Sequence, residues 1–163
     1  MRAAPVLAFT LLASSSAAQQ PETAPIADFV LVDKSDRVLT LYANGRPYRT
    51  IEGLQFGDAP QGHKQFQGDE RTPEGRYTLD YGNPQSSYWL SLHISYPNAA
   101  DRAYAAARGR SPGGAIFIHG QPNWLPDGRL PGDWTDGCIA LSNAEIELLW
   151  QVVPDGTPIE IRP

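Results

Sequence analysis

The chain has 163 residues and a formal net charge of −5, with 13 lysines and arginines against 18 aspartates and glutamates. An acidic chain without a basic stripe cannot neutralise a row of phosphates, which excludes nucleic acid as the expected partner. The single cysteine, Cys138, has no partner for a disulfide within the chain, so its thiol is either an inert buried group or a reactive one.

The N-terminal segment has the pattern of a secretory signal peptide. A positively charged start is followed by an uncharged, mostly apolar run over residues 3–13 and then by small residues suited to a signal peptidase. The run is too short for a membrane anchor, which needs about 20 apolar residues. We expect residues 1–18 to be removed on export to the periplasm or the exterior, and no stable membrane insertion afterwards. Residues 19–27 are then a leader tail, and residues 28–163 one folded domain.

Short strands dominate the pattern of the first half of that domain. Runs rich in β-branched and aromatic residues alternate with turn residues, and Asn44-Gly45 is the strongest short-range signal for a hairpin. The glycine-rich segment 53–75 is predicted to be a long loop with functional potential. The predicted strands cover residues 29–32, 37–42, 47–51, 77–81 and 90–94.

The second half alternates between helices, strands and loops. Asn98 predicts the cap of a short helix over residues 98–108, and Ser142 with Glu145 predicts a capping box for a second one. Strands are predicted over residues 115–118 and 157–161, with a loop over residues 121–134. Seven or eight strands and two short α-helices predict a mainly β fold, either a β-sandwich or a mixed β-rich fold.

A cysteine nucleophile needs a base that accepts its proton, and three histidines are available. His119 is the best placed, because it ends a buried strand and is followed by Gly120, so its ring would emerge at the edge of the sheet. His93 lies on the opposite face of its strand from Leu92 and Ile94, and His63 lies in a loop. Taken singly, each histidine is more often structural than catalytic.

The turn around Cys138 favours chemistry over the simpler role of a small buried apolar residue. Gly137 permits positive φ, so the backbone amides of Asp136, Gly137 and Cys138 are predicted to converge on an oxyanion. Thr135 supplies a hydroxyl that can support the turn.

Four separated motifs resemble the L,D-transpeptidase catalytic domain, also called the YkuD-like domain. They are Ile116–Gly120 (IFIHG), Thr135–Leu141 (TDGCIAL), the upstream Arg71–Tyr77 (RTPEGRY) and the closing Gly156–Ile161 (GTPIEI). The loop between the first two has the family's length of about 14 residues. The resemblance covers nearly all of residues 28–163.

The resemblance implies a β-sandwich with two short helices and an exported cysteine acyltransferase that acts on peptidoglycan stem peptides. Cys138 would attack the carbonyl of an L-centre, and His119 would be the general base and then the acid for the leaving amine. No metal or cofactor is implied, and no ligand pair has zinc spacing. Two alternatives stay open. One is a hydrolase of the same fold, either an L,D-carboxypeptidase or an amidase that releases wall-linked protein. The other is a non-catalytic peptidoglycan-binding module.

Asp136 departs from the family pattern, in which most members have histidine before Gly-Cys. It resembles a subgroup with Thr-Asp-Gly-Cys that includes hydrolases. A carboxylate beside the thiol should raise the pKa of Cys138, so we expect Asp136 to point elsewhere. It would then orient His119 or pair with Arg71 or Arg102, unless it is a solvated turn residue.

Further candidates for substrate binding come from the loops and the first helix. Arg102, and also Arg71, could hold a stem-peptide carboxylate in a bidentate clamp. Trp124 and Trp134, between His119 and Cys138, are predicted to line a cleft.

Overall fold

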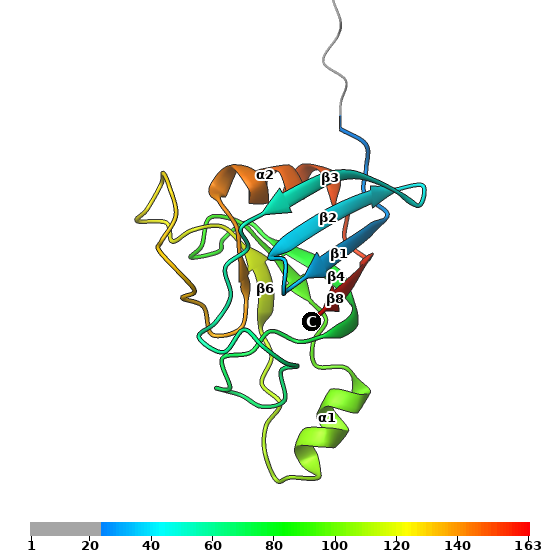
Figure 1. Cartoon of the computed structure of the whole chain (residues 1–163), viewed down its shortest axis with the longest axis vertical. Coiled ribbons are helices and arrows are strands. Elements are labelled where there is room, and N and C mark those ends of the chain that lie inside the picture. The colour runs from blue at the N-terminus through cyan, green and yellow to red at the C-terminus, as the bar shows by residue number, and fades with distance from the viewer. Residues whose placement is uncertain (1–23) are drawn as a thin grey trace, which may run out of the picture.

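The strands form one strongly bent sheet around a core. The computed structural model describes residues 24–163, and Figure 1 shows their arrangement. The predicted mainly β class with two short helices is confirmed, and the hydrogen-bonded order is β3-β2-β1-β8-β4-β5-β6-β7. The strands are β1 (Phe29–Asp33), β2 (Val38–Ala43), β3 (Arg46–Glu52), β4 (Gly75–Asn83), β5 (Ser91–Ile94), β6 (Ile116–His119), β7 (Ile139–Ala140) and β8 (Thr157–Arg162). The helices are α1 (Ala99–Ala106) and α2 (Asn143–Val152).

The first three strands form the predicted antiparallel meander. Asn44 and Gly45 have φ values of 53° and 71°, so the turn between β2 and β3 has the positive φ at both centres that the sequence predicted. Val30 pairs with Leu41 across β1 and β2, and both side chains are fully buried. Alternate residues of each strand therefore face the core.

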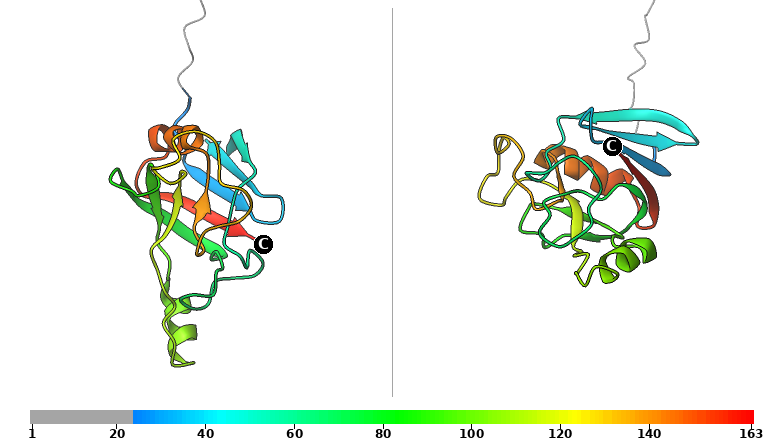
Figure 2. Two further views of the ribbon diagram at one scale, coloured as in Figure 1. Left: turned by 90° about the vertical axis from the view of Figure 1, so that its left-hand side faces the viewer. Right: turned by 60° about the horizontal axis from the view of Figure 1, so that its bottom comes forward.

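β8 joins the two halves of the sheet. It pairs in parallel with β1 and antiparallel with β4, so the N-terminal meander and the β4–β7 half are hydrogen-bonded to one another only through this strand among the described residues. Figure 2 shows how the two halves bend around the interior, with α2 beside them. The strands of the predicted β-sandwich are thus joined in one continuous hydrogen-bonded sheet.

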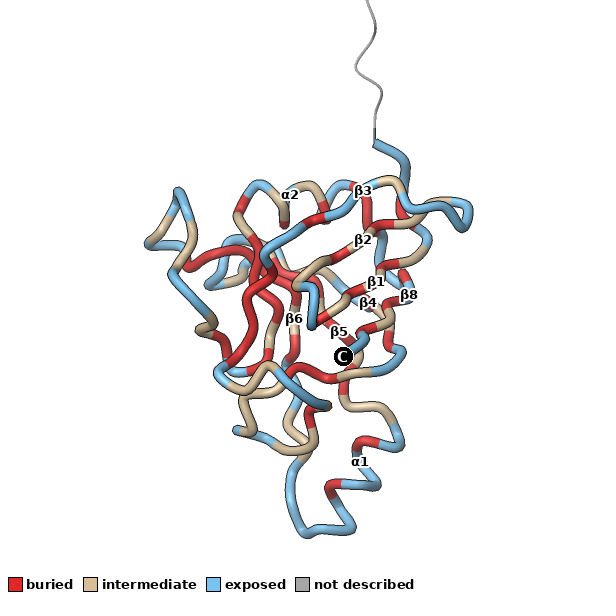
Figure 3. Tube along the Cα trace, in the orientation of Figure 1, coloured by how far each residue is buried: buried red, intermediate tan, exposed pale blue. Residues whose placement is uncertain are grey.

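The core lies between the halves of the sheet and under α2. Buried positions concentrate along the strands and in the segments next to β6 and β7, whereas α1 and the outer loops are largely exposed (Figure 3). α2 buries Ile146 and Leu149 completely, and its predicted capping box between Ser142 and Glu145 is confirmed. Trp150 packs against the core from its edge, over the backbone of Gly82.

α1 projects from the body of the molecule (Figures 1 and 2). Asn98 caps it as predicted, and Asp101 completes a capping box that the sequence analysis did not anticipate. Gly109, with φ of 63°, follows the end of the helix. Within residues 24–163 no helix has the length and apolar character needed to cross a membrane.

Candidate active site

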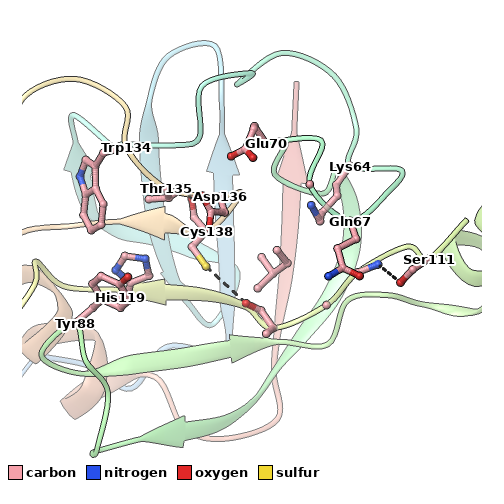
Figure 4. A pocket seen from close by; sticks show the side chains of 15 residues that line it. Lys64, Gln67, Glu70, Tyr88, Ser111, His119, Trp134, Thr135, Asp136 and Cys138 are labelled. Atoms are coloured by element: carbon pink, nitrogen blue, oxygen red, sulfur yellow. Dashed lines mark hydrogen bonds between the residues drawn. The ribbon is translucent and has the colours of Figure 1, made fainter.

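A cavity of about 890 Å³ opens between the end of β6, the turn before β7 and the loop over residues 53–75 (Figure 4). His119 and Cys138 both line it, together with Trp134, so the structure brings the predicted sulfur and imidazole to one site. Its other lining residues are Lys64, Gln67, Gly68, Glu70, Tyr88, Ser111, Gly113, Gly114, Ala115, Ile116, Thr135 and Asp136.

A parallel strand pair places the two reactive side chains. β6 and β7 pair so that Ile118 lies opposite Ile139 and His119 opposite Ala140. Cys138 directly precedes β7, which puts its side chain beside the end of β6, and Figure 4 shows the sulfur and the ring facing the same cavity. β7 has only two residues, which is too few for a periodic pattern, so the sequence gives no sign of this strand.

His119 has a fixed tautomer. Its Nδ1 lies 2.7 Å from the carbonyl oxygen of Gly120, and because a carbonyl can only accept, Nδ1 carries the proton and Nε2 is left as the base. The ring is buried between Tyr88 and Trp134, at centroid distances of 4.7 and 5.5 Å. Burial lowers the pKa of His119 to about 4, although the bond to Gly120 acts in the opposite direction.

The thiol of Cys138 is half-buried and protonated at neutral pH. Sγ accepts a hydrogen bond from the Phe117 N–H at 3.4 Å and donates toward the Ala115 carbonyl oxygen at 3.7 Å. Burial raises the pKa of Cys138, the Phe117 N–H lowers it, the Asp136 carboxylate raises it and Lys64 lowers it, with a net upward direction. The resting site therefore holds a neutral thiol beside a neutral imidazole, not an ion pair.

The turn that carries Cys138 is fixed by the predicted Thr135. Thr135 Oγ1 donates to the Cys138 carbonyl oxygen at 2.8 Å and accepts from the Gly137 N–H at 3.2 Å. The Gly137 N–H is therefore engaged, although it was predicted to point at an oxyanion together with the N–H groups of Asp136 and Cys138. Within residues 24–163 the N–H groups of Asp136 and Cys138 have no acceptor, so these two amides remain as candidate oxyanion donors.

Gly137 is required at its position by backbone contact as well as by conformation. Its φ is 122°, a region that L side chains rarely adopt. A Cβ there would overlap the carbonyl oxygen of Arg71. The segment around Arg71 and the turn that carries Cys138 are thus packed backbone to backbone.

The loop over residues 121–134 is held at its base. Asp133 forms two 2.7 Å hydrogen bonds with Arg37, and Gln55 donates to the Leu130 carbonyl oxygen at 2.6 Å. The indole N–H of Trp134 also donates to Gln55, at 3.3 Å. These contacts fix Trp134 against the cavity, in agreement with its predicted position.

Three predicted substrate-binding residues lie outside the lining of the cavity. Arg102 is exposed on α1 and donates to the Pro97 carbonyl oxygen, so it does not form the predicted clamp. Arg71 contributes its backbone to the packing of Gly137, and its guanidinium lies near Gly62. Trp124, in the loop over residues 121–134, is 71% exposed. None of these three residues lines the cavity, so the prediction that Trp124 lines a cleft at this site is wrong.

Asp136 is exposed at the rim of the cavity. Its carboxylate makes no hydrogen bond or ion pair with any other residue of the described range 24–163, so it neither orients His119 nor pairs with Arg71 or Arg102. This corrects the predicted role and agrees with the alternative of a solvated turn aspartate. Because Asp136 lies close enough to raise the pKa of Cys138, it acts on the thiol through charge.

The other two histidines, His63 and His93, make structural contacts away from the cavity. His63 Nδ1 accepts from the Glu74 N–H at 2.9 Å, and its Nε2 lies 3.1 Å from Asp101, which ties the loop to α1. His93 stacks on Tyr81 at 4.5 Å, on the face of β5 opposite to the core, as the alternation predicted.

Several cavity residues were not singled out from the sequence. Lys64 is buried and forms an ion pair with Asp69 at 2.9 Å. Glu70 and Tyr88 also line the cavity. They lie in loops, where no periodicity marks a side chain as facing a site. The only available signal was the glycine-rich character of residues 53–75.

We expect the stability of the protein to fall in acid partly because of His119. Its pKa is about 4 when folded and 6.5 in an unfolded chain, so between these values the unfolded state binds more protons and stability rises with pH. The contribution is complete above 6.5 and is lost as pH falls through 4. From about pH 7 to 4.5 it should decrease by about 2 kcal/mol.

Urea unfolding of the wild type and of His119→Gln at both pH values measures this loss. The glutamine variant cannot titrate at residue 119, so its decrease should be smaller by that amount. Equal decreases in the two proteins would contradict the burial of a neutral imidazole.

Comparisons with known proteins agree on one family. The sequence profile of the YkuD family, described as the L,D-transpeptidase catalytic domain, matches residues 27–161. The chain is 29% identical over 130 residues to YafK of Escherichia coli K12, which is 77% of this chain and 46% of YafK.

Solved structures have the same fold. The helical cell shape determining protein Pgp2 of Campylobacter jejuni superposes with a TM-score of 0.66 at 34% identity, over 83% of this chain and 47% of Pgp2. An L,D-transpeptidase of Xylanimonas cellulosilytica, at 18% identity, shares the fold with a TM-score of 0.53 over 86% of this chain and 62% of its own. The chain thus spans about half the length of YafK and Pgp2.

Proposed function

Because the chain belongs to the L,D-transpeptidase catalytic domain family, we propose that it is an exported cysteine acyltransferase that acts on peptidoglycan stem peptides. One observation carries the proposal: Cys138 and His119 line the same cavity, and the hydrogen bond to Gly120 leaves His119 Nε2 without a proton. A thiol and an imidazole base at one site are the minimum for acyl transfer.

In the first step, Cys138 Sγ attacks the carbonyl carbon of an L-centre in the stem peptide. As the S–C bond forms, Nε2 of His119 takes the thiol proton, because both groups are neutral at rest. The Gly120 carbonyl oxygen accepts from Nδ1 and so stabilises the imidazolium that results. This carbonyl fills the orienting role that a carboxylate has in other triads.

The tetrahedral intermediate places a negative charge on the former carbonyl oxygen. The N–H groups of Asp136 and Cys138 are the donors available for it at the turn. In enzymes where one such donor was removed, the loss was about 3 kcal/mol of transition-state stabilisation. When the intermediate collapses, the imidazolium protonates the leaving amine, and Cys138 is left as a thioester.

The thioester is then attacked by an acceptor, with His119 again taking a proton. An amine of a second stem peptide gives transfer, and water gives hydrolysis. A second cavity, of about 300 Å³, also contacts Cys138 and His119, on a side lined by neutral polar groups such as Ser87 and Ser91. Two cavities that are both lined by Cys138 and His119 favour transfer between two substrates.

We further propose that residues 1–18 direct export and that residues 28–163 are the catalytic domain. The signal sequence lies outside the described residues, so its support is the sequence pattern alone. Action outside the cytoplasm suits a peptidoglycan substrate. Pgp2 is described as a helical cell shape determining protein, and we propose that this chain also acts in determining cell shape.

Purified muropeptides test the function directly. We expect the wild type to produce cross-linked dimers, identified by mass spectrometry, and Cys138→Ala to produce none. If the products are shortened stem peptides without dimers, the activity is hydrolysis and not transfer. If no product forms, and a column of immobilised wild-type protein only retains muropeptides, the chain is a binding module and the enzymatic proposal is wrong.

A further inference from the structure

Thr72, from the upstream Thr-Pro motif, reaches the turn that carries Cys138. Its side chain is fully buried, and Oγ1 donates to the Gly137 carbonyl oxygen at 2.9 Å. The Gly137 carbonyl and the Cys138 N–H belong to one trans peptide, so they point in opposite directions. A bond that holds this carbonyl therefore also sets the direction of the Cys138 N–H.

Thr72 is itself held in place by a buried lysine. Lys34 Nζ donates to the Thr72 carbonyl oxygen at 3.4 Å and to the Gly62 carbonyl oxygen at 2.8 Å, and it pairs with Glu74 at 2.7 Å. The Arg71 carbonyl oxygen lies against Gly137 where no side chain would fit. The donor hydroxyl is therefore attached to a segment with little freedom to move relative to the turn.

We propose that Thr72 is a positioning residue that aims the Cys138 N–H at the oxyanion. The inference rests on the proposed acyl transfer, because an oriented amide matters only when a carbonyl is attacked. It also gives the Thr-Pro motif a role, since none of its residues reaches the reacting atoms. The hydrogen bond acts on the orientation of the donor and leaves the sulfur and the imidazole untouched.

Two reagents that modify the same sulfur separate these effects. p-Nitrophenyl acetate acylates a thiol through a tetrahedral oxyanion and releases p-nitrophenolate, whereas iodoacetamide alkylates it by displacement of iodide, without an oxyanion. For Thr72→Val, which keeps the shape and removes the hydroxyl, we expect acylation to be slower by about 10- to 100-fold. Alkylation should be unchanged, and Thr72→Ser should restore acylation.

Thr157→Val is the matched control. Thr157 is also buried, and its Oγ1 donates to the Pro154 carbonyl oxygen at 2.7 Å, at a turn that does not line the cavity. Thr157→Val should lose about as much stability as Thr72→Val does, and it should react with p-nitrophenyl acetate at the wild-type rate. Thermal unfolding of all three variants checks that they are folded.

The proposal is wrong if Thr72→Val acylates like the wild type, if acylation and alkylation fall together, or if Thr72→Ser is as slow as Thr72→Val. The acetate probe does not depend on the natural substrate. If the wild type reacts with the ester and does not convert muropeptides, the proposed function is wrong. The ratio of the acylation rate to the alkylation rate would still test the role of Thr72.

Discussion

Replacing Cys138 with serine is expected to lower acyl-enzyme formation by about 10⁴-fold or more, while the protein stays folded. His119 is a weak base, since burial lowers its pKa to about 4. It can assist a thiol far better than a hydroxyl, because a hydroxyl is a much weaker acid. The exchange of sulfur for oxygen leaves the turn and its hydrogen bonds in place.

The burst of p-nitrophenolate and the turnover of muropeptides both measure this loss. Cys138→Ala gives the background, and thermal unfolding checks the fold. A serine variant that keeps a hundredth of the activity, or more, would mean that the thiol is not the nucleophile or that the imidazole is a stronger base than its burial implies.

Gly137→Ala is expected to cost both stability and activity. The added Cβ overlaps the Arg71 carbonyl oxygen, and φ of 122° is unfavourable for alanine. Neither backbone segment can move freely, so we expect a loss of about 2–4 kcal/mol in the free energy of unfolding. Turnover should fall by about 10²-fold or more, because the turn carries both Cys138 and the amide donors.

Gly132→Ala is the matched control for this variant. Gly132 also has a positive φ, of 66°, but a Cβ there meets nothing within 4 Å. It should lose about 1 kcal/mol through backbone conformation alone and retain its activity. If the two variants behave alike in urea unfolding and in turnover, backbone contact at Gly137 is not what the site requires.

Local signals were sufficient for most of the fold. Asn44-Gly45 fixed a hairpin because few residue pairs tolerate two positive φ values, and Ser142 with Glu145 marked the start of α2 because both groups are needed to satisfy its first amides. Such signals act within four residues of one another. They contain no information about which strands become neighbours, so the parallel pairing of β1 with β8 was not predicted.

The candidate site also contains residues that could be predicted from the sequence and residues that could not. The spacing of His119 and Cys138 could be recognised from the chain, whereas the direction of a long side chain depends on the element that carries it. Arg102 was expected near the substrate and instead donates to Pro97, because α1 projects from the body of the molecule. Thr72 was visible only as part of a motif, since its partner, Gly137, is 65 residues away.

The position of β8 also determines when the protein can become reactive. This strand follows the other seven in chain order, yet it lies at the centre of the sheet and connects its two halves. Pairings between segments so far apart must wait until translation has passed them, and β-rich topologies of this kind fold in milliseconds to seconds. A nascent chain that lacks β8 has no joined sheet, so the cavity that brings Cys138 and His119 together should assemble only after synthesis has supplied that strand.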